Sequence, residues 1–154
     1  MANYTGANVI TTSDIQKYQP DAFDFGISTT ATETTNFLAQ TTNDILRQLR
    51  VEWWPVYKTN IFTDITVLNT AEMVNTKVNL DQFERAGVYL FLGRFFLPAL
   101  TKFRPETEKD RFERMAEYYM SQYNMEWRMI LEDGVEYDVD ADGTIVSNER
   151  EPLH

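Results

Sequence analysis

Apolar residues recur at steps of three and four along three long stretches of the chain, which is the spacing of one face of an α-helix. At about 33–53 this face contains Phe37, Leu38, Thr41, Ile45, Leu49 and Trp53. After Asn79 it contains Leu80, Phe83, Gly87, Leu90, Arg94 and Leu97. After Pro105 it contains Phe112, Met115, Tyr119, Tyr123, Trp127 and Ile130. The pattern predicts three long helices, and the middle one, apolar almost all round, is expected to be central.

Residues that favour helix ends indicate where these helices begin and stop. The run TTSD at 11–14 indicates a short first helix, which Pro20 ends. Pro55 is expected to stop the helix at 33–53, because a proline has no backbone N–H to donate. Pro105 suits the first turn of the last helix, and Gly134 ends that helix.

Residues 59–78 show no clear period. The apolar residues of this stretch do not alternate; they are Ile61, Phe62, Ile65, Val67 and Leu68. We interpret 59–78 as an extended linker or a short edge strand, with room for a short helix near 70–74.

The predicted fold class is therefore all-α: a small helical bundle of about four helices with an extended arm at each end. We place a flexible N-terminal arm at 1–10, the bundle at 11–132 and an acidic C-terminal arm at 133–154. No apolar run reaches the roughly 20 residues of a membrane span. The nearest, 88–100, is interrupted by Arg94. The first residues also lack the basic flank and apolar run of a secretory signal.

Charge and composition exclude several functions. With 24 acidic and 14 basic residues the net charge is −10, which argues against gripping nucleic acid or an anionic membrane. There is no cysteine, and the single histidine is the last residue, His154, so the common nucleophile–base pairs cannot be assembled. No glycine-rich phosphate loop occurs. We therefore do not expect an enzyme.

One motif in the C-terminal arm has metal-ligand spacing. The pattern D-x-D-x-D-G matches a calcium loop, whose candidate ligands are Asp138, Asp140, Asp142, Thr144 and Glu149. Thr144 would contribute its backbone carbonyl, and Glu149 would bind bidentately. Val146 stands where a polar residue is usual, and aspartate–glycine runs also form solvated turns. A Ca²⁺ site and a polar turn both remain open. We do not expect a helix–loop–helix sensor, because only residues 150–154 follow.

Three aromatic residues at the end of the second helix are candidate anchors. Trp53, Trp54 and Tyr57 belong to residue types that are enriched both in cores and at protein interfaces. They are expected to serve as core anchors or as contacts between subunits rather than as a ligand platform.

The order of segments resembles tailed-phage head–tail connector proteins, the neck adaptors. The resemblance lies in TTSDIQKYQPDAFD, TNFLAQTTNDILRQLR, LDQFERAGVYLFLGRFF and DRFERMAEYYMSQYNMEW, followed by YDVDADGTIVSNE. It implies a homo-oligomeric ring, a dodecamer, between the portal protein and a head-closure or tail protein. It places the protein in the virion neck, assembled in the host cytoplasm, with arms that reach adjacent copies. DNA would pass through the lumen without specific binding, since an acidic wall repels phosphates.

Two other classes of function are weighed against this one. A monomeric calcium-dependent binding module would melt at a higher temperature with calcium. An acidic regulatory protein that mimics DNA would gather its acids on one face, whereas here they scatter over the last helix and the tail.

Overall fold

The structure, a computed structural model, describes residues 8–62, 64–102 and 104–138. Most of these residues lie in helices. Among the described residues, the only β-pairing is an isolated antiparallel bridge between Val78 and Tyr137. The all-α prediction is confirmed, but the described part of the chain contains more helices than the four expected. In the same part of the chain, no helix is both long and apolar enough to cross a membrane.

The first helix, α1, spans Thr12–Tyr18, as the TTSD run predicts. Its N-cap is Thr11, whose hydroxyl accepts from the Asp14 N–H while the Asp14 carboxylate accepts from the Thr11 N–H. This reciprocal capping satisfies two backbone donors that the helix itself leaves without partners. A 3₁₀ turn, η1, follows at Ala22–Asp24.

The second helix, α2, spans Thr32–Glu52 and continues after one residue into α3, Trp54–Ile61. Pro55 ends α2 as predicted, yet it also lies in the first turn of α3, where a missing N–H costs nothing. Helix α4, Ile65–Thr70, follows, capped by Asp64, which accepts from the Thr66 N–H at 2.9 Å. The prediction of an extended linker or edge strand over 59–78 is therefore wrong for the residues of α3 and α4.

The predicted central helix is divided into segments. A 3₁₀ turn, η2, at Asn75–Lys77 and another, η3, at Leu80–Phe83 lead into α5 at Glu84–Leu90. The chain then widens into a π-helical segment, η4, at Phe91–Phe96, and ends as α6 at Leu97–Leu100. Arg94 of η4 pairs with Asp44 of α2 at 3.0 Å.

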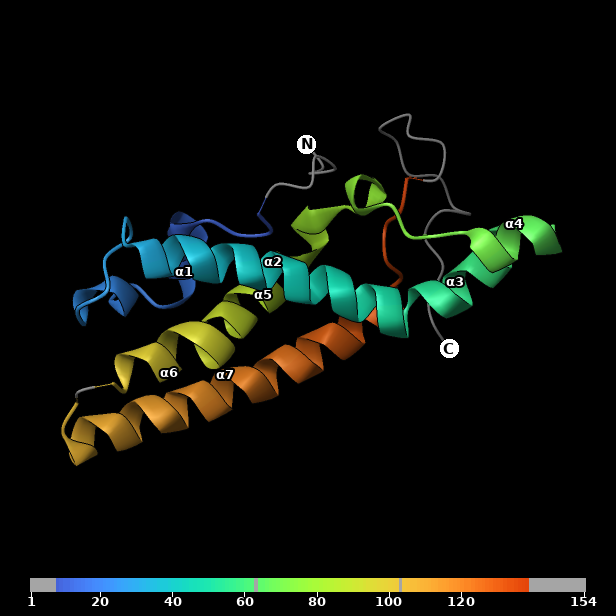
Figure 1. The fold of residues 1–154 in the computed structure, drawn as a ribbon. Helices are drawn as coiled ribbons and strands as arrows, with labels where there is room; N and C mark the ends of the chain where they lie inside the picture. Colours follow the sequence, from blue (N-terminus) through green and yellow to red (C-terminus); the bar gives the residue numbers. More distant parts are fainter. Residues whose placement is uncertain (1–7, 63, 103, 139–154) are drawn as a thin grey trace.

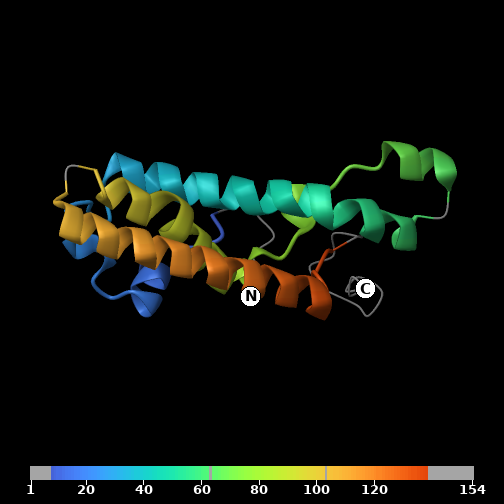
Figure 2. The same cartoon turned by 90° about the horizontal axis from the view of Figure 1, so that it is seen from below.

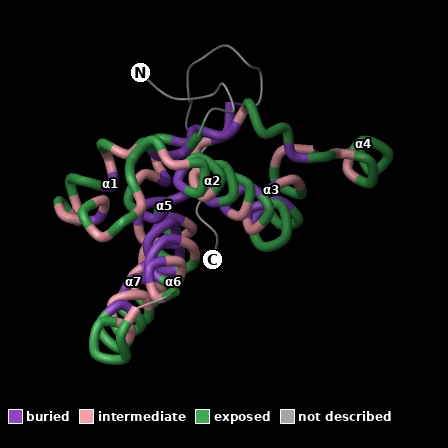
Figure 3. The backbone as a smooth tube through the Cα atoms, turned by 60° about the vertical axis from the view of Figure 1, so that its left-hand side comes forward, coloured by how far each residue is buried: buried purple, intermediate pink, exposed green. Residues whose placement is uncertain are grey.

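The last helix, α7, spans Glu106–Asp133 and ends at Gly134, whose φ of 97° suits glycine. In Figures 1 and 2, α2, the segment from α5 to α6, and α7 run alongside one another as an elongated body. Figure 3 shows the buried residues concentrated where these rods meet. The helices α3 and α4 continue from the end of α2 and leave the body at one side.

The described parts of both predicted arms fold back on their own subunit. Val9 and Ile10 are buried, and the Val9 N–H donates to the Thr42 hydroxyl at 2.9 Å. At the other end, the Asp138 N–H donates to the Lys77 carbonyl at 2.8 Å, and Tyr137 is buried. The arm boundaries predicted at 1–10 and 133–154 thus include residues of the core, because their apolar side chains find partners on the body.

Candidate docking surface

The junction of α2 and α3 is built around a cluster of aromatic rings. Trp53 and Tyr57, one helical turn apart, stack with their ring centroids 4.3 Å apart. Tyr137, which reaches them from beyond α7, lies 5.2 Å from Trp54 and 5.6 Å from Tyr57 between centroids. The Trp54 indole donates to the Ala71 carbonyl at 3.2 Å. Rings from two separate parts of the chain, together with the Ala71 carbonyl, therefore fix the direction in which α3 leaves the body.

This packing decides between the two roles considered for Trp53, Trp54 and Tyr57. Their exposed fractions are 1%, 4% and 2%, so their own subunit covers them. They belong to the core, and the prediction that they themselves form the contact between subunits is corrected. Burial also raises the pKa of the Tyr137 phenol, although the Val74 N–H donates to its oxygen and opposes that rise.

The helices α3 and α4 form a projection, which we define as residues 54–74. The aromatic cluster lies at its base, and α4 lies at its outer end. Figure 1 shows α4 standing clear of the body, and Figure 3 shows it mostly exposed. No residue of α4 is buried, and Ile65 is 70% exposed. The other large apolar side chains exposed on the projection are Val56, Val67 and Val74.

The projection is also poor in charge. It contains only Lys58, Asp64 and Glu72, one charged residue in seven, whereas 25% of the whole chain is charged. Exposed apolar residues with few charges around them are typical of the centre of a protein–protein contact. This surface was missed from the sequence because 59–78 was interpreted as a linker. The one signal that could have revealed it is Asp64, an N-cap residue directly before an apolar run.

A polar network joins α2 to α7 on the body. The Trp127 indole donates to the Glu52 carboxylate at 2.7 Å, and the Gln48 amide donates to the same oxygen at 3.0 Å. The Tyr123 hydroxyl donates to the Gln48 carbonyl, and burial raises the pKa of that phenol. A cavity of about 290 Å³ lies beside Gln48 and Glu52. The network satisfies buried polar atoms between two helices.

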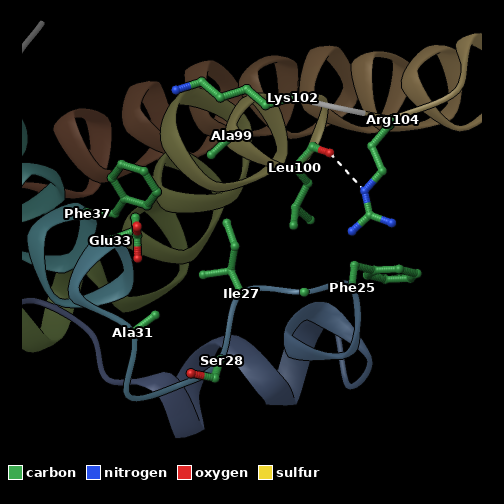
Figure 4. A pocket seen from close by; sticks show the side chains of 11 residues that line it. Phe25, Ile27, Ser28, Ala31, Glu33, Phe37, Ala99, Leu100, Lys102 and Arg104 are labelled. Carbon is green, nitrogen blue, oxygen red and sulfur yellow. Dashed lines mark hydrogen bonds between the residues drawn. The ribbon is translucent and has the colours of Figure 1, made fainter.

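Another cavity, of about 400 Å³, lies at the opposite end of the body from α4. Figure 4 shows Arg104 at its rim, where the guanidinium donates to the Leu100 carbonyl at 3.2 Å. Lys102 and Glu33 are the other charged residues that line it. Ser28 also lines the cavity, and its hydroxyl lies 3.4 Å from the Thr30 hydroxyl.

The calcium-loop prediction falls almost entirely on residues that the structure does not describe. Asp138 is buried, whereas Asp140, Asp142, Thr144 and Glu149 lie outside the described residues. Among the residues that are described, no group of three or more metal-ligating side chains comes together. The Ca²⁺ site remains a prediction.

The chain was compared with protein-family models, with curated proteins and with solved structures. None of them matches it.

Proposed function

We propose that this protein is a structural assembly subunit that forms a homo-oligomer through the projection 54–74. The single observation that carries the proposal is an extended pair of helices whose outermost member has no buried residue and exposes Ile65. An isolated helix of six residues is unstable in water, because helix nucleation costs more than so short a segment returns. A partner that covers α4 would supply the missing stabilisation.

The exposed apolar side chains of the projection supply a driving force for such a contact. Fully burying one large aliphatic side chain gives roughly 1.5–3 kcal/mol. Ile65 and Val67 on α4 and Val56 on α3 are all exposed. This gain offsets the loss of freedom on association when further surface of the projection is buried together with these three side chains.

More specifically, we propose a tailed-phage head–tail adaptor, on the strength of the resemblance described above. The adaptor would form a ring, a dodecamer by that resemblance, between the portal protein and a head-closure or tail protein in the virion neck. The charge of −10 supports this proposal, because a conduit for DNA works by repelling phosphates rather than by holding them. The contact between copies is assigned to the projection instead of the terminal arms, since the described parts of both arms pack on their own subunit.

Light scattering of the purified chain tests the proposal. We expect a mass many times the 18.0 kDa of one subunit, either for the chain alone at high concentration or after addition of a portal ring. The double variant Ile65→Ser/Val67→Ser should remain at the mass of one subunit and keep the Tm of the parent, since neither side chain is buried.

Val51→Ser is the matched control, because Val51 is equally exposed but lies on α2 in the body. It should assemble like the parent chain. A parent chain that stays monomeric at high concentration and does not bind a portal ring would contradict the proposal, as would equal loss of assembly in the control.

A further inference from the structure

A second exposed apolar surface lies on α7, far from the projection. Tyr118, Met125 and Met129 are exposed, and their spacing of seven and four residues places them on one face of the helix. We call these three residues the α7 stripe. The opposite side of α7 carries the buried residues that pack on the body, including Tyr119 and Tyr123. In the view of Figure 2, α7 is in front of the body and nothing described covers it.

We propose that the projection of one copy docks on the α7 stripe of the next copy. This inference rests on the proposed assembly function and names the two surfaces that meet. The occupant is a second copy because α4 cannot reach the α7 stripe of its own subunit. In Figures 1 and 2, α4 lies beyond the end of α7.

One pair of charges beside the two surfaces is complementary. Arg114 is exposed one turn before Tyr118 on the same face of α7, and Asp64 is exposed directly before Ile65 on the projection. Two copies with a net charge of −10 repel each other over most of their surfaces. The projection, with one charged residue in seven against 25% for the whole chain, approaches another copy with little of this repulsion.

The dimensions and side chains of the two surfaces also agree. From Tyr118 to Met129 the stripe is roughly 16 Å long, and α4 is roughly 8 Å long, at 1.5 Å per helical residue. The stripe is therefore long enough to receive all of α4 together with its neighbours in the projection. Methionine is enriched at protein interfaces, and its unbranched side chain adapts to the shape of an incoming surface.

Because the two surfaces differ, the contact is head-to-tail. Each copy offers a projection to one neighbour and a stripe to the other, so the contact repeats until it closes into a ring. A symmetric dimer, in which two projections meet each other, would instead stop at two copies. This difference makes the assignment testable.

Mixing two variants separates these arrangements. Ile65→Asp/Val67→Asp disables the projection, and Met125→Asp/Met129→Asp disables the stripe. Each variant alone should be monomeric and keep its helical circular dichroism and Tm, because all four side chains are exposed. An equal mixture should give a dimer, in which the intact stripe of one variant holds the intact projection of the other.

The parent chain, measured beside the mixture, distinguishes two failures. If the parent chain assembles neither alone at high concentration nor on a portal ring, the proposed function and the docking assignment both fail. If it assembles while the mixture of folded variants stays monomeric, only the docking assignment is overturned. It is overturned equally if the stripe variant assembles like the parent.

Engineered cysteines supply an independent measurement, since the chain contains no cysteine of its own. The variant carrying both Val67→Cys and Met125→Cys should form a ladder of cross-linked species under mild oxidation. Either single substitution should give almost no cross-linking. Dimers from Val67→Cys alone would mean that two projections meet, and would overturn the head-to-tail contact.

Discussion

At the scale of single residues, the capping of α1 shows how a local pattern becomes a tertiary contact. Lys17 lies 3.1 Å from the Asp14 carboxylate and 3.3 Å from the Glu84 carboxylate of α5. Burial of Asp14 favours its neutral form, but the hydrogen bonds from Thr11 and Lys17 outweigh burial and lower the pKa of this carboxyl. Its charged form therefore stabilises the folded chain.

The pH dependence of stability tests this role of Asp14. A lowered folded-state pKa contributes stability above the ordinary value of 3.8, and that contribution is lost as the pH falls through the folded-state pKa. Asp14→Asn should lower the free energy of unfolding by about 0.5–1 kcal/mol at neutral pH. The difference from the parent chain should shrink below pH 3.8. Urea denaturation at neutral pH and below pH 3.8 measures the free energy of unfolding of both chains. Glu106→Gln, in the first turn of α7, is the control.

At the scale of elements, the segment from α5 to α6 differs most from its sequence pattern. The apolar period predicts one continuous helix, whereas the chain widens into η4 just before Pro98. Pro98 has no N–H to donate to the preceding turn, and a local change in helical winding is a known response to such a loss. Gly93, within η4, lets this segment approach α7 closely.

Adding a single methyl group at Gly93 tests that approach. A Cβ there would lie 3.0 Å from the backbone nitrogen of Met120 and 2.9 Å from its Cγ. Backbone cannot move aside cheaply, so Gly93→Ala should lower the free energy of unfolding by about 1–3 kcal/mol. Thermal and urea denaturation measure the loss.

Gly87→Ala is the matched variant in α5. Its Cβ would meet methyl groups of Val9 and Ile10 at 3.0 Å, and side chains can move where backbone cannot. Replacing glycine by alanine raises helix propensity by a similar amount at both positions. The difference between the two losses in free energy of unfolding therefore reports the close contact at Gly93. An equal or larger loss at Gly87 would show that η4 is not the tighter of the two contacts.

At the scale of the whole molecule, the chain combines a well-packed body with a projection that contributes little to its own core. Three rods bury their apolar faces against one another, and the aromatic cluster at the end of α2 holds α3 at a fixed direction. A monomer gains little from such an extension. An assembly that covers it gains an apolar contact in every copy.

The predicted calcium loop gives a prediction at the same scale. If assembly is the function, added calcium and a chelator should both leave the mass of the particle and the Tm nearly unchanged. A marked rise in Tm with calcium, abolished by Asp142→Asn, would favour the calcium-dependent binding module instead. Light scattering and thermal denaturation with and without calcium distinguish the two.

The sequence alone determined the local features of this protein. The sequence predicts the apolar periods of α2 and α7, the helix start at 11–14 and the helix end at Gly134. These features are local, because backbone hydrogen bonds and one-sided apolar faces depend on residues a few positions apart. The all-α class follows from the same signals. The pattern was weakest at 59–78, where α4 carries no buried face to mark it.

Only the tertiary structure decided which side chains are covered. Trp53 became core rather than surface because Tyr137, more than eighty positions away in the chain, packs against it. Val9 and Ile10 became core because Gly87 leaves room for them. Ile65 stayed exposed because the direction of α3 carries it away from the body. Burial is a property of distant contacts, which the spacing of residues along a helix does not contain.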